Sequence, residues 1–105
     1  MDIRSLEERI KKTRTMILYF FNPDCAACNS LRPKVEEMVL TKFPGLELLS
    51  IDASTNPSLT SKVGVYSAPT ILVFFEGMEY IRESKYISVQ QLGFKISRYY
   101  DMIFS

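Results

Sequence analysis

The sequence of 105 residues contains no histidine, so it lacks the commonest general base and the commonest transition-metal ligand of proteins. Only two cysteines are present, Cys25 and Cys28. A structural zinc site needs four ligands, and one chain offers two thiolates and no imidazole. Only a dimer would bring four thiolates together, an alternative that the sequence leaves open. For the single chain we expect no metal site.

Excess charge and long apolar stretches are also lacking. Thirteen Lys and Arg residues oppose twelve Asp and Glu residues, which gives a net charge of +1 and no electrostatic footprint for nucleic acid. The longest apolar run, Met16–Phe21, is far shorter than the ~20 residues of a membrane-spanning helix. The charged N-terminal segment contains no signal-peptide stretch. We therefore expect a cytoplasmic protein without nucleic-acid or membrane partners.

The composition that is present fits one folded unit. Hydrophobic residues make up 47% of the chain and charged residues 24%, the balance of an ordinary globular protein. The length matches a typical domain of ~100–150 residues, and no repeat or linker interrupts it. We expect residues 1–105 to form a single domain.

Hydrophobic periodicity predicts a mixed α/β architecture. The run Met16–Phe21 is typical of a strand that is covered on both faces, and Leu46–Ile51 predicts a second buried strand. The expected elements are helices over about 2–13, 25–41, 57–62 and 89–103, and strands over about 16–21, 46–51, 70–75 and 78–85. The first two strands should pair in parallel through a right-handed crossover, and the turn Glu76–Gly77 predicts an antiparallel pair. The result is a four-stranded mixed sheet flanked by helices.

The two cysteines occupy a position that favours redox chemistry. Cys25 follows a predicted strand and turn and opens a predicted helix, whose unpaired amides favour a thiolate, the attacking species. Cys28 lies one turn further on, with Cα atoms about 5 Å apart, a separation that a disulfide tolerates. Cys25 would attack a substrate disulfide, and Cys28 would then release the product by forming the internal disulfide. The alternative is two buried cysteines that act as small hydrophobic residues.

These motifs resemble the thioredoxin family over nearly the whole chain. The strand Met16–Phe21, the Cys-Ala-Ala-Cys segment and Pro33 are similar to the family's first core strand, active site and helix-kinking proline. The strand ending Ser50–Asp52 also fits. The segment Val63–Thr70 looks like the family's loop that carries a cis proline.

The resemblance implies a thioredoxin fold and a thiol–disulfide oxidoreductase with catalytic Cys25 and Cys28. Such a protein exchanges its dithiol with protein disulfides and takes electrons from an external reductase, as a monomer without a cofactor of its own. Pro69 would be cis and would face Cys25 across a substrate groove, and Ala68 would offer its backbone to the substrate. The residues expected around this groove are Ala26, Ala27, Tyr66, Ala68 and Pro69.

Several residues depart from the family pattern. Asp24 stands where the family has tryptophan, and its negative charge opposes ionisation of the neighbouring thiol. Tyr19 and Leu48 replace a buried acid and its lysine partner, so the family's means of deprotonating the second thiol is missing. Lys85 aligns with a glycine beside the groove. The dithiol chemistry is retained, but efficient general reductase behaviour is in doubt.

Two alternative functions are compatible with a fold of this kind. A glutaredoxin is disfavoured because no convincing glutathione-binding Gly-Gly-Asp segment is present. A non-catalytic module of the same fold could hold a protein partner in the same groove without turnover. Phe94 and Phe104 lie off the main apolar stripe of the last helix, and we expect both to pack in the core or at the helix end.

Overall fold

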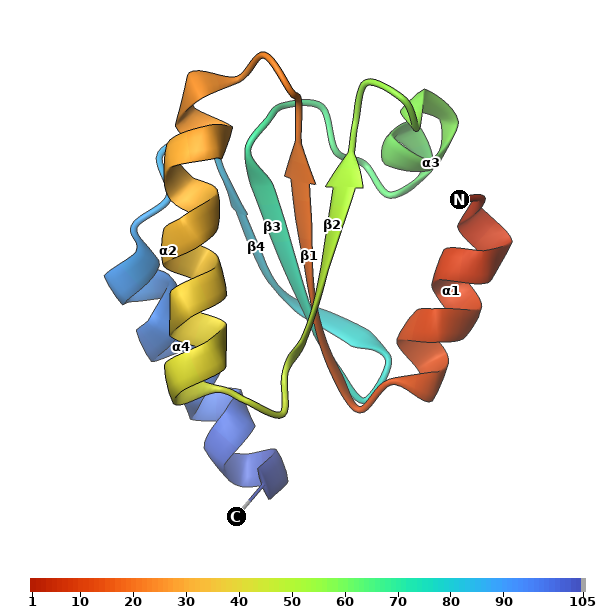
Figure 1. The fold of residues 1–105 in the computed structure, drawn as a ribbon. Coiled ribbons are helices and arrows are strands. Elements are labelled where there is room, and N and C mark those ends of the chain that lie inside the picture. Colours follow the sequence, from red (N-terminus) through yellow and green to blue (C-terminus); the bar gives the residue numbers. More distant parts are fainter. Residues whose placement is uncertain (105) are drawn as a thin grey trace.

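All eight expected elements form in the expected order in the computed structural model, which describes residues 1–104 (Figure 1). The elements are α1 (Ile3–Lys12), β1 (Thr15–Phe21), α2 (Ala26–Lys42), β2 (Glu47–Asp52), α3 (Pro57–Lys62), β3 (Thr70–Phe75), β4 (Met78–Ser84) and α4 (Val89–Phe104). Helix α2 continues through Pro33. Within residues 1–104, no helix is long and apolar enough to cross a membrane.

The four strands form one mixed sheet in the order β2-β1-β3-β4. Strand β1 pairs in parallel with β2 and antiparallel with β3, and β4 closes the sheet with a second antiparallel pairing. The predicted topology is therefore confirmed. Because β1 lies at the centre of the sheet, the loop that follows it has neighbouring chain on both sides.

Alternation along the central strands divides the core into two layers. Met16 and Leu18 face α1 and α3 on one side of the sheet, whereas Ile17 and Tyr19 face α2 and α4 on the other. Figure 1 shows these two pairs of helices on opposite sides of the sheet. Both faces of β1 are buried, which accounts for its uninterrupted run of apolar residues.

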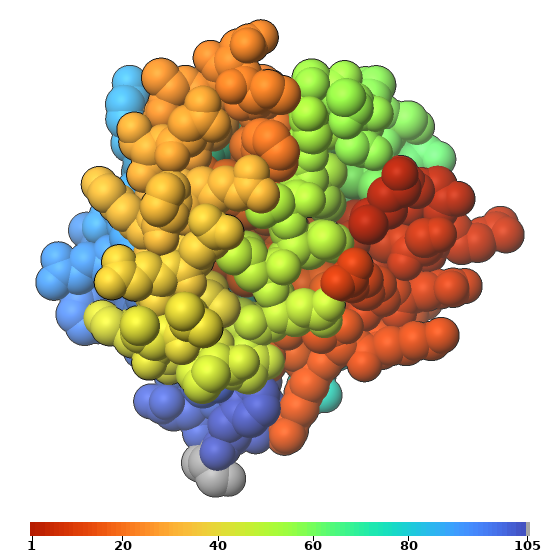
Figure 2. All heavy atoms as spheres, viewed as in Figure 1, coloured from red at the N-terminus to blue at the C-terminus, as the bar shows by residue number. Residues whose placement is uncertain are grey.

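Strand β2 is more exposed than its apolar sequence predicts. Most of its residues are only half-buried, and Ile51 is the fully buried one. Figure 2 shows its yellow-green atoms at the surface between α2 in orange and yellow and α1 in red. The expectation of a buried strand over Leu46–Ile51 holds at its two ends but not between them, because β2 forms an edge of the sheet.

The turn between β3 and β4 requires an unusual backbone. Glu76 and Gly77 have φ angles of 52° and 82°, so both central residues adopt the left-handed conformation of a type I′ hairpin turn. Glycine adopts this conformation freely, whereas in glutamate the Cβ makes it unfavourable by a steric clash with the backbone. Lys85, which aligns with a glycine of the family, also has a positive φ, of 64°.

Candidate active site at the start of helix α2

The end of β1 and the start of α2 position Cys25. A backbone hydrogen bond from Cys25 to the Asn22 carbonyl, 3.1 Å long, closes the turn between them. Cys25 is the N-cap of α2 and has an extended backbone. Its sulfur accepts a hydrogen bond of 3.1 Å from the Cys28 amide. The sulfur therefore lies where helix amides and the helix dipole stabilise a negative charge.

Cys25 and Cys28 are joined in a disulfide, with a Cα–Cα distance of 5.2 Å. Cys28 is only 1% exposed, whereas Cys25 is partly exposed. An incoming substrate can therefore reach the first sulfur, while the second lies beneath it.

The loop before β3 brings Ala68 and Pro69 to the cysteines. The Ala68–Pro69 peptide bond is cis, as expected from the family pattern. The Ala68 carbonyl oxygen lies 3.9 Å from the Cys25 sulfur. In the disulfide this sulfur carries no hydrogen, so the contact is not a hydrogen bond. The Lys85 amide donates to the Pro69 carbonyl at 3.1 Å, and the Thr70 hydroxyl donates to the Ser67 carbonyl at 2.7 Å. These bonds hold the loop beside the disulfide.

The remaining predicted groove residues lie around this centre. Ala26 and Ala27 are exposed on the first turn of α2, and Pro69 is buried. Tyr66 is 85% exposed and lines, together with Ala68, a hollow of about 360 Å³ beside the loop.

The same hollow contains residues that sequence reasoning missed. Asn22 comes from the loop after β1, Ala53 from the loop after β2, and Thr60 from α3. No motif marks these residues. The one available signal is topological, because the carboxyl ends of two parallel neighbouring strands meet at the same edge of the sheet.

Tyr19 lies directly beneath the cysteine pair. Its side chain is 1% exposed, and its hydroxyl donates a hydrogen bond of 2.6 Å to the Cys28 carbonyl. Burial raises the pKa of the Tyr19 phenol above its usual value, an effect that the nearby Arg32 charge opposes. Leu48 packs against the same core layer. A neutral phenol bonded to a carbonyl does not serve as a base at neutral pH.

The surroundings of the cysteine pair contain a charged side chain but, within residues 1–104, no metal centre. Arg32 lies over the Phe21 ring, with 4.9 Å between the guanidinium carbon and the ring centroid. Across residues 1–104, no group of three or more carboxylate or thiol side chains is placed to hold a metal ion. The chemistry that these atoms can perform is thiol–disulfide exchange.

Comparisons with known proteins agree with this geometry. The thioredoxin family model matches residues 2–95. The chain is 30% identical to a thioredoxin-like protein of Bacillus subtilis, YdfQ, over 91% of this chain and 85% of the relative. It is 31% identical to a thioredoxin of Rickettsia bellii, over 70% and 71% of the two chains. A mutant thioredoxin of Halobacterium salinarum has the same fold, with a TM-score of 0.83 at 22% identity, over 95% and 87% of the chains. The chain belongs to the thioredoxin family and is a thiol–disulfide oxidoreductase.

Proposed function

We propose that Cys25 is the nucleophile and Cys28 the resolving thiol in the reduction of protein disulfides. The observation that carries this assignment is the partly exposed sulfur at the N-terminus of α2 above a buried partner. The Cys25 thiolate attacks one sulfur of the substrate disulfide, and the other substrate sulfur leaves as a thiolate. The Cys28 thiolate then attacks the Cys25 sulfur, which releases the second substrate thiolate and forms the internal disulfide. Two electrons pass to the substrate.

The substrate is an extended segment that lies along the loop before β3. The Ala68 backbone beside Cys25 supplies the pairing edge, and the exposed Ala26 and Ala27 leave room above the disulfide. Pro69 forms the wall opposite Cys25, and Tyr66 contacts the flanking substrate residues from the rim. Small side chains at the first helical turn favour a bulky protein substrate, because they place no obstacle in front of the sulfur.

An external dithiol reductase returns the protein to its reduced form. Residues 1–105 act as one domain in the cytoplasm. The domain acts as a monomer, since the exchange requires one cysteine pair and one substrate edge. Electron transport and maintenance of cellular redox balance are the roles that this activity supports.

Reduction of insulin disulfides by the reduced protein tests the assignment. Cys25→Ser should abolish turnover, whereas Cys28→Ser should trap a covalent mixed disulfide between Cys25 and the substrate. Turnover that persists in Cys25→Ser would overturn the assignment. Wild-type protein that binds unfolded substrates but does not reduce them would favour a non-catalytic binding module instead.

A further inference from the structure

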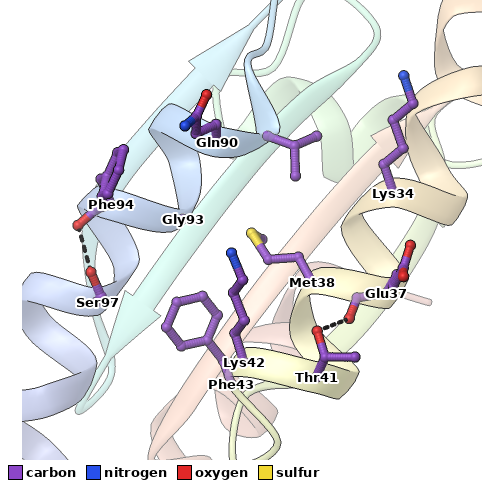
Figure 3. A pocket seen from close by; sticks show the side chains of 11 residues that line it. Lys34, Glu37, Met38, Thr41, Lys42, Phe43, Gln90, Gly93, Phe94 and Ser97 are labelled. Carbon is purple, nitrogen blue, oxygen red and sulfur yellow. Dashed lines mark hydrogen bonds between the residues drawn. The ribbon is translucent and has the colours of Figure 1, made fainter.

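A cavity lies away from the cysteines, between α2 and α4. It has a volume of about 750 Å³, within the range of small-molecule sites (Figure 3). On α2 the cavity begins at Lys34, about 13 Å along the helix axis from Cys25 at 1.5 Å per residue. We refer to this cavity as the α2–α4 groove. It has no part in the exchange proposed for the cysteine pair.

A helical glycine lets Met38 of α2 pack closely against α4 at the floor of the α2–α4 groove. Gly93 lies within α4, where glycine is the poorest helix former after proline. A Cβ at this position would lie 3.3 Å from the Met38 sulfur, closer than an ordinary van der Waals contact, so Met38 fills the space that a side chain would take. Met38 packed on Gly93 therefore forms the floor of the groove.

The floor of the groove is apolar, polar side chains line its walls, and an exposed aromatic side chain lies at its edge. Met38 and Phe43 are buried beneath it, whereas Phe94 is 65% exposed. The expectation that Phe94 packs in the core or at the helix end is therefore wrong. Phe104 does pack at the helix end, where its ring contacts that of Tyr100 in a tilted arrangement with 4.4 Å between the centroids.

One cation is directed along this apolar surface. Figure 3 shows the Lys42 side chain extending from the end of α2 along the groove toward Met38, whereas the charged ends of Lys34 and Glu37 turn away from it. Within residues 1–104, Lys42 has neither an ion pair nor a hydrogen bond from its ammonium group. An unpaired ammonium above an apolar floor complements a ligand with an apolar body and an anionic head.

We propose that the α2–α4 groove binds a small amphipathic carboxylate. Its apolar body lies over Gly93 between Met38 and Phe94, and its carboxylate pairs with Lys42. A free small molecule matches the volume of the groove, and the single inward-directed cation matches a single negative head group. The site is independent of the proposed function, because none of its residues touches the cysteine pair.

Titration of the full-length protein with decanoate, below its micelle concentration, tests the proposal by backbone amide NMR. Saturable shifts should centre on Met38, Gly93 and Phe94. Gly93→Leu should weaken binding at least about tenfold, because the larger side chain would displace Met38 from the floor, an effect of the size of two buried methylene groups. Phe94→Ser should also weaken it, and this exposed position cannot disturb the core.

The charge on Lys42 is tested with a matched pair of variants and a neutral ligand. Lys42→Gln should weaken decanoate binding about three- to fivefold, as for an exposed ion pair, and leave decanol binding unchanged. Lys34→Gln, whose ammonium points away, should change neither. Equal effects of Lys42→Gln on both ligands would overturn the ion pair. Absent shifts would overturn the site, because no ligand binds there. Scattered shifts would overturn it in favour of a detergent effect, and shifts that grow with protein concentration alone in favour of a second copy of the chain.

Discussion

Tyr19 shows how one residue changes role when its chemistry changes. The family places an acid at this position, where it serves the second thiol. Here the phenol is buried, and its proton is donated to the Cys28 carbonyl rather than held near a sulfur. The bond ties the first turn of α2 to the central strand. Tyr19 is therefore a structural anchor of the active-site helix.

Tyr19→Phe should lower the free energy of unfolding by about 1 kcal/mol at neutral pH, because one buried hydrogen bond is lost. The raised pKa of Tyr19 means that the folded state holds its proton after the unfolded state has released it. This contribution to stability is complete below about pH 10 and falls as pH rises further. Denaturant melts at neutral and alkaline pH should show a shallower alkaline loss in Tyr19→Phe than in wild type. Parallel losses would contradict the buried neutral phenol.

The difference in burial between the cysteines predicts their order of reaction. In the reduced protein, alkylation should modify Cys25 first, since Cys28 is almost fully buried. Mass spectrometry of the singly modified protein measures the site directly. Urea-unfolded protein, in which both thiols are exposed, is the control and should lose the preference. Modification of Cys28 first would reverse the proposed roles.

At the scale of elements, the turn between β3 and β4 combines a favourable glycine with an unfavourable glutamate. Glu76 adopts a left-handed backbone and also pairs with Arg14, with 3.1 Å between the charged atoms. Both side chains are more than half exposed, so the ion pair adds little to stability. The backbone cost at Glu76 is the larger effect.

Glu76→Asn should therefore raise the free energy of unfolding by about 0.5–1 kcal/mol, because asparagine tolerates the left-handed region in a type I′ turn. Thermal or urea melts measure the change. Glu76→Gln removes the charge without relieving the backbone, so it should leave stability unchanged or slightly lower. A gain in Glu76→Gln equal to that in Glu76→Asn would assign the effect to charge instead of conformation.

The whole molecule has two core layers separated by the sheet. Ile10 belongs to the layer under α1 and α3, and Ile96 belongs to the layer under α2 and α4. The sheet holds them apart, with no buried residue common to the two clusters. Energetic effects on the two faces should therefore be independent.

Ile10→Val and Ile96→Val should each lower the free energy of unfolding by about 1 kcal/mol, the usual effect of removing one buried methyl group. The double variant should lose the sum of the two values within about 0.5 kcal/mol. Urea melts of the four proteins complete the cycle. A larger deviation would show that the two layers are coupled through the sheet.

The sequence by itself determined the order of the elements, the mixed sheet and the cysteine pair at a helix start. Strand β1 could be recognised from its run of apolar residues, and the β3–β4 hairpin from Glu76–Gly77, because these signals act between neighbours in the chain. Family resemblance added the cis bond before Pro69. The predicted strand pairing also places β2 at an edge of the sheet. Its residues are therefore less buried than their apolar composition suggests.

Only the tertiary structure decided which distant residues meet. The bond from Tyr19 to the Cys28 carbonyl, the hollow shared by Asn22 and Thr60, and the groove lined by both Lys42 and Phe94 each join segments that are separate in sequence. Local periodicity states which face of an element is apolar. It does not state how closely two helices approach or where a side chain ends, and these depend on packing across the whole sheet.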